Sequence, residues 1–266
     1  MTHDIFSINN TLIKHILKLT NNRYYRQDHN SSVIYGDKSI ISANQQQMIT
    51  DILVKDKYYN QYYPLFRNDN IKWHIITNQA IFKKINPLQL DYPICALIKY
   101  KPQPSLKSSL TNNCILLDNI QDPGNLGNIF RTVAAVTNNK TYILLSSGSV
   151  DAYHPKVLRA SMGTQFALPI LQNIDLATFI TSYTNNKGQV FACHSGSNQQ
   201  QLYHYNFSQY SRIALVFGNE GQGISTHILA AVNNYIYIPM AQCVESINVA
   251  SAVAVILYEL YRQSFI

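Results

Sequence analysis

The sequence predicts a two-domain α/β protein, with a small α/β domain followed by a mostly parallel sheet that has helices on both faces. Residues 114–266 alternate short apolar runs with helical stretches. Runs such as 213–217, Ile-Ala-Leu-Val-Phe, are apolar at every position, which is typical of parallel strands buried on both sides. A length of 266 residues also suits two modest domains.

The composition favours a folded, nucleic-acid-binding protein. Hydrophobic residues make up 46% and charged residues 13% of the chain, whereas disordered chains carry more charge and fewer apolar residues. Residues 1–105 hold 13 Lys and Arg against 7 Asp and Glu, and residues 106–266 hold 8 against 7. A basic first domain favours a polyanionic partner, RNA or DNA. Simple solubility is the alternative interpretation.

The cysteines and the first residues of the sequence bear on the cellular compartment in which the protein is expected. The four cysteines show no CxxC or metal-finger spacing, which predicts buried free thiols and no metal site. The first residues lack a signal-peptide pattern. The longest apolar run, 249–258, is about half a membrane span. We therefore expect a cytoplasmic protein without a membrane segment.

The first domain, expected at residues 1–100, begins with an amphipathic helix. Apolar residues between 8 and 19 recur at helical spacing, with Lys14 and Lys18 on the polar side. The other elements expected here are strands at 33–35, 51–54, 71–77 and 93–100 and helices at 38–47 and 78–85.

A Pro/Ser/Asn-rich segment at 101–113 is interpreted as a linker. The second domain is then expected at 114–266. Its predicted strands lie at 114–118, 142–146, 166–170, 189–193, 212–217 and 235–238, and its predicted helices at 125–137, 155–162, 175–185, 224–232 and 247–263.

The first loop with chemical potential reads Asp-Pro-Gly-Asn-Leu-Gly-Asn-Ile-Phe-Arg-Thr at 122–132, directly after a predicted strand. We expect Asn125 to cap the following helix. Asn125 and Arg131 share the polar face of that helix, at the end where an anion is favoured. An ordinary capped helix with a solvated arginine is the competing interpretation.

The second loop reads Gly-Asn-Glu-Gly-Gln-Gly-Ile-Ser at 218–225. Its glycines allow the backbone to approach a ligand closely. The spacing matches neither the dinucleotide fingerprint nor the P-loop. Glu220 stands between glycines and is expected to be held by an arginine or by backbone N–H groups. The alternative is a common strand-to-helix turn.

The third loop follows Ile-Pro-Met at 238–240 and leads into a long apolar helix. We expect Ser246 to cap this helix and Asn248 to lie in its first turn, with backbone N–H groups left for a ligand. Capping alone is the alternative.

A further segment, 154–163, carries a basic pair. Pro155 suits a helix start, and His154 before it is expected to be a cap or a surface residue rather than a catalyst. Lys156 and Arg159 are spaced to contact a phosphate.

Together, these loops closely resemble the three motifs of the SpoU (TrmH) branch of the SPOUT RNA methyltransferases. Their order and separations match, as does Lys-Val-Leu-Arg-Ala-Ser-Met-Gly at 156–163, and residues 114–263 are covered. Residues 7–10 and 33–36 resemble the substrate-binding domain that often precedes this one, which is built like small RNA-binding ribosomal proteins.

The resemblance implies a deep trefoil knot in the second domain and a homodimer in which Arg131 of one subunit completes the other subunit's site. It also implies S-adenosylmethionine as the cofactor. The residues implied to bind it are Cys193, His194, Ser195, Gly196, Phe217, Gly218, Asn219, Gly221, Ile238, Pro239, Met240, Ser246, Ile247 and Asn248.

The implied reaction is methyl transfer to a ribose 2′-oxygen of RNA. A guanidinium stays protonated in proteins, so Arg131 is expected to bind the RNA phosphate and stabilise the developing alkoxide. Asn125 and Ser246 would orient the ribose or the cofactor. Asn248 would hydrogen-bond near the methyl group, and Glu220 would hold Arg131 or the loops. The residues expected to contact RNA are Lys14, Lys18, Lys156 and Arg159.

Three alternatives stay open. The substrate could be transfer RNA, although the basic first domain favours ribosomal RNA. The chain could bind RNA without catalysis, which the intact motif residues argue against. The methyl group could go to a base, whereas the Ser-x-Asn of the third motif favours ribose.

Overall fold

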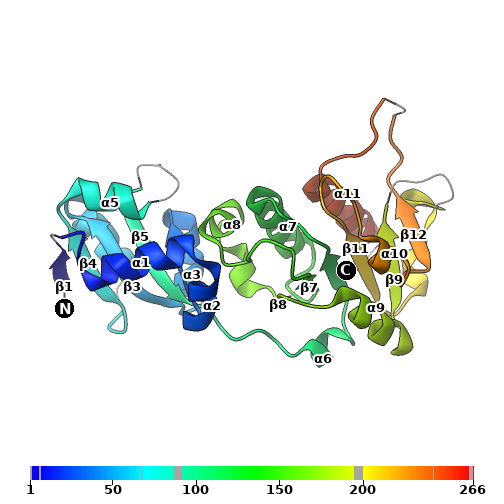
Figure 1. Cartoon of the computed structure of the whole chain (residues 1–266), viewed down its shortest axis with the longest axis horizontal. Coiled ribbons are helices and arrows are strands. Elements are labelled where there is room, and N and C mark those ends of the chain that lie inside the picture. The colour runs from blue at the N-terminus through cyan, green and yellow to red at the C-terminus, as the bar shows by residue number, and fades with distance from the viewer. Residues whose placement is uncertain are drawn as a thin grey trace. The chain divides into compact units, whose positions relative to one another are not determined.

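The computed structural model describes residues 2–5, 7–66, 68–86, 92–194, 200–241, 243–263 and 266. The chain forms two compact units, whose elements are labelled in Figure 1. The first unit comprises Met1–Pro102 and Tyr153–Phe166, and the second comprises Gln103–Ala152 and Ala167–Ile266. The sequence-based division instead places 153–166 with the second domain.

The first unit contains a five-stranded mixed sheet in the order β1-β4-β3-β5-β2. Strands β1, β4 and β3 are parallel, while β5 runs antiparallel to both β3 and β2. The strands are β1 (Thr2–Ile5), β2 (Ser31–Tyr35), β3 (Ile49–Lys55), β4 (Lys72–Ile76) and β5 (Ile94–Lys99). The helices are α1 (Thr11–Asn21), α2 (Arg23–His29), α3 (Asp37–Gln45), α4 (Tyr59–Tyr62) and α5 (Gln79–Ile85). Strand β1 and helices α2 and α4 were not predicted.

Helix α1 shows how the local sequence sets the fold of this unit. The side chain of Asn10 caps it by accepting a hydrogen bond from the Leu12 N–H at 2.8 Å. Of the apolar positions predicted to face inward, Ile13, Ile16 and Leu19 are buried, and Ile8, Leu12 and Leu17 are partly buried. Lys14 and Lys18 are exposed on the opposite face, as predicted.

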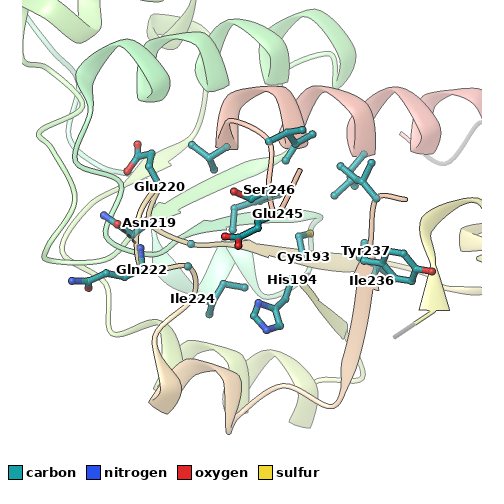
Figure 2. A pocket seen from close by; sticks show the side chains of 18 of the residues that line it. Cys193, His194, Asn219, Glu220, Gln222, Ile224, Ile236, Tyr237, Glu245 and Ser246 are labelled. Carbon is teal, nitrogen blue, oxygen red and sulfur yellow. Dashed lines mark hydrogen bonds between the residues drawn. The ribbon is translucent and has the colours of Figure 1, made fainter. Parts of the chain in front are cut away.

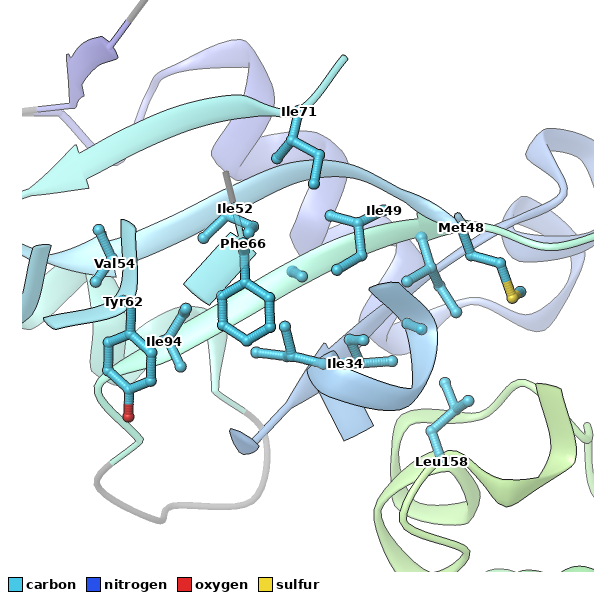
Figure 3. Packing of buried hydrophobic residues seen from close by; sticks show 14 of the residues in the cluster. Ile34, Met48, Ile49, Ile52, Val54, Tyr62, Phe66, Ile71, Ile94 and Leu158 are labelled. Atoms are coloured by element: carbon cyan, nitrogen blue, oxygen red, sulfur yellow. The ribbon is translucent and has the colours of Figure 1, made fainter. Parts of the chain in front are cut away.

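Two hydrophobic cores cover the two faces of this sheet. One lies under α1 and α5 and contains Ile13, Ile16 and Phe82. The other, shown in Figure 3, includes Leu158 and Phe166 from the segment 153–166. Two residues from a segment far beyond residue 102 therefore contribute to the core of the first unit.

Polar contacts fix the segment 153–166 in place. It contains α8 (Pro155–Ala160), which His154 caps as predicted by accepting from the Lys156 N–H at 3.2 Å. The hydroxyls of Ser32 and Ser42 donate to the carbonyls of Tyr153 (2.7 Å) and Gly163 (2.9 Å). Both carbonyls lie just outside α8, and these bonds tie the two ends of the segment to β2 and α3.

We expect Leu158→Ala to destabilise the protein by about 3 kcal/mol, because a fully buried leucine leaves a cavity when truncated. Lys156→Ala, exposed on the same helix, should change the free energy of unfolding by less than about 0.5 kcal/mol. Urea denaturation measures both. Equal stability of the two variants would contradict the assignment of α8 to this core.

The second unit contains a seven-stranded parallel sheet in the order β10-β12-β9-β11-β6-β7-β8, which confirms the predicted mostly parallel α/β fold. The strands are β6 (Cys114–Leu117), β7 (Tyr142–Leu145), β8 (Ile170–Leu171), β9 (Gln189–Cys193), β10 (Gln200–Gln201), β11 (Ile213–Phe217) and β12 (Asn234–Tyr237). The helices are α6 (Leu106–Ser109), α7 (Pro123–Val136), α9 (Leu176–Asn185), α10 (Thr226–Leu229) and α11 (Val249–Arg262).

Two of the sequence expectations for this unit differ from the structure. The strand expected at 166–170 is mostly absent, since 164–167 form a 3₁₀ turn and β8 has only two residues. The segment 101–113, expected to be a linker, contains the short helix α6. At 166–170 the apolar pattern is too short to distinguish a strand from a turn. At 101–113 a helix of four residues is too short to show a helical period in a Pro/Ser/Asn-rich segment.

Successive side chains of the strands lie on opposite faces of the parallel sheet, and both faces are buried. Cys114, Leu116 and Val216 pack in one core with Phe179 and Ile180 of α9. The intervening residues of β6 and β11 point to the other face and are buried as well. This explains why these strands are apolar at every position.

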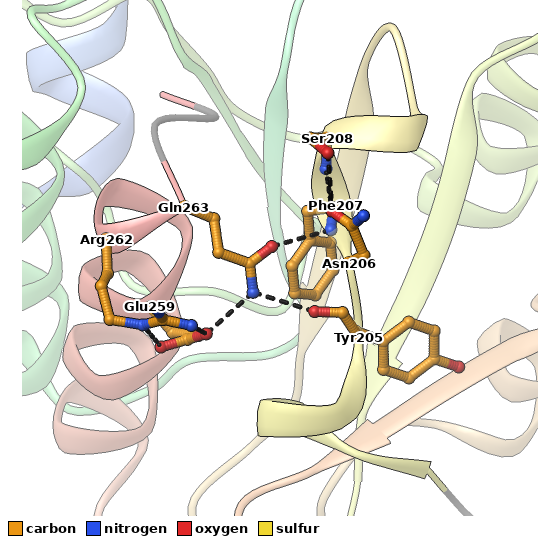
Figure 4. Close-up of polar contacts among 7 residues, drawn as sticks. All are labelled: Tyr205, Asn206, Phe207, Ser208, Glu259, Arg262 and Gln263. Atoms are coloured by element: carbon orange, nitrogen blue, oxygen red, sulfur yellow. Dashed lines mark hydrogen bonds and ion pairs between the residues drawn. The ribbon is translucent and has the colours of Figure 1, made fainter.

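A polar cluster at the end of α11 anchors this helix, as Figure 4 shows. The buried Glu259 carboxylate accepts two hydrogen bonds from Arg262, at 2.8 and 2.6 Å, and one from Gln263 at 2.8 Å. The Gln263 amide also donates to the Tyr205 carbonyl and accepts from the Phe207 N–H. The last turn of α11 is thereby tied to residues 205–207.

The Glu259 cluster predicts a stability that depends on pH. Hydrogen bonds from Arg262 hold the pKa of the Glu259 carboxyl below its usual value. Its contribution is therefore present above the usual glutamate pKa of about 4.3 and is lost as the pH falls through the lowered pKa. Wild type should exceed Glu259→Gln in free energy of unfolding at pH 7, and the difference should shrink as the pH is lowered into the acid range. Urea denaturation across this range tests it, and a difference that persisted in acid would contradict it.

Candidate functional site

A cavity of about 320 Å³ opens at one edge of the second unit's sheet, as Figure 2 shows. Strands β9, β11 and β12 are parallel neighbours and end there, so the segments that follow them line the cavity together. Helix α11 contributes Val249, Ala252 and Ile256. Ligands of open α/β sheets bind at this carboxyl edge of the strands.

The loop after β11 is held in one shape by its own hydrogen bonds. Asn219 and Gly223 exchange backbone hydrogen bonds in both directions at 2.9 Å. The Asn219 side chain accepts from the N–H groups of Gly221 (2.9 Å) and Gln222 (3.1 Å) and donates to the Asn119 carbonyl at 2.8 Å. This wall of the cavity is therefore preorganised.

Asp118, which follows β6, fixes the other end of this loop. Its buried carboxylate accepts from both the N–H (2.8 Å) and the hydroxyl (2.6 Å) of Ser225. Sequence analysis gave Asp118 no role, although a carboxylate that ends an apolar strand needs a partner when buried.

The first helix of the site begins two residues earlier than predicted. Helix α7 starts at Pro123, and Asp122 caps it by accepting from the Asn125 N–H at 2.7 Å. The prediction that Asn125 is the cap was wrong, because proline favours the first helical position and places the cap immediately before it. The Asn125 side chain is thereby left for other contacts.

The prediction that Ser246 caps the last helix was also wrong. Asn248 caps α11 by accepting from the N–H groups of Ala250 (2.9 Å) and Ser251 (3.4 Å). Ser246 lies before the helix, is exposed and lines the cavity. A cap must accept from the second or third helical N–H, and Asn248 rather than Ser246 is in register to do so.

Asn125 connects the three loops that sequence analysis singled out. Its Oδ1 accepts a hydrogen bond from Asn248 Nδ2 at 2.8 Å, and its Nδ2 donates to Glu220 Oε1 at 2.9 Å. We call these three residues the amide relay. Asn125 is thereby joined to Glu220, which is 95 positions away in the chain, and to Asn248, which is 123 positions away.

Arg131 lies on the exposed side of α7 and is not among the residues that line the cavity. Among the described residues, no ion pair or hydrogen bond joins it to Glu220. Glu220 was expected to be held by an arginine or by backbone N–H groups, and the hydrogen bond that holds it comes instead from the side-chain amide of Asn125.

Most of the residues predicted to bind a cofactor line this cavity. They are Cys193, His194, Phe217, Gly218, Asn219, Gly221, Ile238, Met240, Ser246 and Ile247. Pro239 and Asn248 do not line it, and Ser195 and Gly196 fall outside the described residues.

The lining residues that sequence analysis missed are Gln222, Gly223, Ile224, Ile236, Tyr237, Glu245, Val249, Ala252 and Ile256. The spacing of the last three places them on one face of a helix. The sequence does not distinguish such a cavity wall from a packed core, because both are apolar positions at helical spacing.

The cavity carries few groups suited to covalent catalysis. Burial raises the pKa of the Cys193 thiol well above its usual value, so this side chain is a neutral thiol at pH 7. No group of His, Cys, Asp and Glu in the described part of the chain could hold a metal ion. The groups that line the cavity are backbone atoms, side-chain amides, carboxylates and apolar side chains, which can bind and orient a ligand.

The four basic residues expected to contact RNA all belong to the first unit. Lys14 and Lys18 lie on α1, and Lys156 and Arg159 lie on α8. All four are exposed. Within the described residues, no helix has the length and apolar character that a membrane span requires.

Residues 112–258 match the model of the SpoU rRNA Methylase family. The chain is 27% identical over 234 residues to 23S rRNA (guanosine(2553)-2′-O)-methyltransferase RlmP of Bacillus subtilis, covering 87% of this chain and 88% of that protein. It is 30% identical over 231 residues to the human mitochondrial rRNA methyltransferase 3, covering 69% of this chain and about half, 52%, of that protein.

Solved structures share the fold. An rRNA methyltransferase from Sinorhizobium meliloti aligns with a TM-score of 0.82 at 22% identity, over 100% of this chain and 99% of that one. The SpoU methyltransferase AviRb from Streptomyces viridochromogenes, in complex with AdoMet, aligns with a TM-score of 0.79 at 21% identity, over 96% and 99%.

Gly218 and Gly221 provide a matched pair of substitutions in the loop after β11. A Cβ on Gly218 would lie 2.1 Å from the Gly223 carbonyl carbon, whereas one on Gly221 would meet only Asn219 Oδ1, at 3.6 Å. Gly218→Ala should therefore cost about 1–3 kcal/mol of unfolding free energy, and Gly221→Ala should cost less than about 0.5 kcal/mol. Urea denaturation measures both. If both variants matched wild type, the loop would be more adaptable than its hydrogen bonds indicate.

Proposed function

The chain belongs to the SpoU rRNA methylase family, and from this premise we propose that it methylates a ribose 2′-hydroxyl of RNA, with S-adenosylmethionine as the methyl donor and ribosomal RNA as the substrate. The observation that carries the proposal is the amide relay, which joins the three motif loops beside a cavity of suitable size.

The lining of the cavity fits this cofactor. Ile224, Ile236 and Ile256 offer apolar surface to an adenosine group, and the carboxylates of Glu220 and Glu245 suit a ligand with positive charge. Near Gly218 the backbone of the loop packs so closely that a Cβ would not fit, so a ligand there meets main chain. When bound, S-adenosylmethionine supplies an electrophilic methyl group.

Within the relay we assign positioning roles. Both ends of the Asn125 amide are engaged by protein groups, and Asn248 uses its oxygen to cap α11 and its nitrogen to hold Asn125. These bonds fix the orientation of Asn125 and of one Glu220 oxygen before RNA arrives. Preorganised groups of this kind need no rearrangement during the reaction. We propose that Ser246, exposed at the cavity wall, orients the ribose or the cofactor.

We propose that Arg131 acts in a homodimer, at the site of the other subunit. Its exposure and its place outside the cavity lining support this. Its guanidinium would bind the RNA phosphate and stabilise the negative charge that develops on the ribose oxygen. The hydroxyl proton would pass to water, and the positive charge of Arg131 would favour its loss by stabilising the oxygen rather than by accepting the proton.

The first unit is proposed to bind the RNA, with Lys14, Lys18, Lys156 and Arg159 on its phosphates. We further propose the trefoil knot that membership of the SpoU family implies. A cytoplasmic location is proposed as well, consistent with four free cysteines.

Transfer of labelled methyl groups from S-adenosylmethionine to unmodified total RNA tests this function, with 2′-O-methyl positions mapped in the product. We expect a single labelled ribose in ribosomal RNA. Label in transfer RNA would change the substrate, and label on a base would change the reaction. RNA binding without any label would favour a non-catalytic RNA-binding protein.

Arg131→Ala is the negative control, and it should lower transfer by roughly 100-fold or more, because a charge that stabilises the transition state is lost. Its circular dichroism and thermal unfolding should match wild type, since Arg131 is exposed. Unchanged turnover would remove Arg131 from the mechanism.

A further inference from the structure

The charged residues of the cavity are both acidic. Among the described lining residues these are Glu220 and Glu245, with no Lys or Arg. A chain with a net charge of +7 thus places two of its three glutamates around one cavity. Such a lining favours a cationic ligand.

The two glutamates differ in how they are engaged. Glu220 Oε1 accepts the Asn125 amide and belongs to the relay. Glu245 has no hydrogen-bond or ion-pair partner among the described residues, and Figure 2 shows its carboxylate turned into the cavity. Glu245 is exposed where it lines the cavity, so its carboxylate is available to a ligand.

We propose that Glu245 is a specificity-determining residue that binds the ammonium group of the methionine part of the cofactor. This proposal rests on the proposed function of the cavity. The cofactor carries two positive groups, a sulfonium and an ammonium. A charge-assisted hydrogen bond needs a donor N–H, which the ammonium has and the sulfonium lacks.

The energetics of methyl transfer also favour the ammonium. The positive charge on the sulfur disappears as the methyl group leaves, so a carboxylate beside it would stabilise the reactant more than the transition state. The charge on the ammonium stays the same throughout. A carboxylate there strengthens binding without opposing the reaction. The amide relay contains Glu220, which is assigned to positioning the reacting groups. No hydrogen bond among the described residues links Glu245 to the relay.

Isothermal titration calorimetry on the full chain tests the assignment with three ligands. S-adenosylmethionine carries both cations, S-adenosylhomocysteine keeps only the ammonium, and 5′-methylthioadenosine has neither. Glu245→Gln, which keeps the size of the side chain, should weaken the first two by about tenfold each, as expected for loss of one charge-assisted bond. It should leave the Kd for 5′-methylthioadenosine unchanged.

Asp69→Asn is the matched control, because it makes the same charge change at an exposed residue of the first unit. Its Kd values should equal those of wild type. Loss of S-adenosylmethionine affinity alone would place Glu245 at the sulfonium, and equal loss for all three ligands would indicate a distorted cavity. Either result, or no loss, overturns the proposal. If wild type itself bound no S-adenosylmethionine, the proposed function would fail instead.

Discussion

The side-chain amide of Asn125 is the contact on which the arrangement of the site depends. An amide has one donor end and one acceptor end, and here Glu220 takes the first and Asn248 the second. Because the two partners come from different loops, neither loop can shift without breaking a hydrogen bond in a half-exposed position. Asn248 also caps α11, so the start of that helix is held in the same network.

The parallel sheet makes this contact possible. Strands that run in the same direction place the loops after them at one edge, whatever their separation in sequence. The loop after β11 is then fixed internally by Asn219 and externally by Asp118, which binds Ser225. The absence of a side chain at Gly218 lets this loop fold back on itself. A cavity with rigid walls suits a ligand that must present one group in one direction.

The first unit uses a different principle, since part of its core comes from far along the chain. Leu158 and Phe166 pack beneath a sheet formed by residues before 100, and the same segment carries Lys156 and Arg159. Exposed basic residues from two distant parts of the sequence are thereby collected on one unit. This gathering of positive charge on one unit is the basis on which the unit is proposed to bind RNA.

The sequence by itself determined the α/β class, the buried strands and the three loops, because these depend on local periodicity and on residue types at fixed spacing. It also placed Lys14 and Lys18 on the exposed face of α1 and His154 at the start of α8. It did not determine the caps, where Asp122 and Asn248 replaced the expected Asn125 and Ser246. The cap is the residue whose backbone geometry lets it reach the second or third helical N–H, and several neighbours compete for it.

Only the tertiary structure decided that Asn125, once released from capping, joins Glu220 to Asn248. It alone decided that 153–166 packs with the first unit, and that Val249, Ala252 and Ile256 face a cavity rather than a solid core. These features are contacts between residues far apart in the chain. The local sequence around an apolar or amide side chain does not determine which distant residue it contacts.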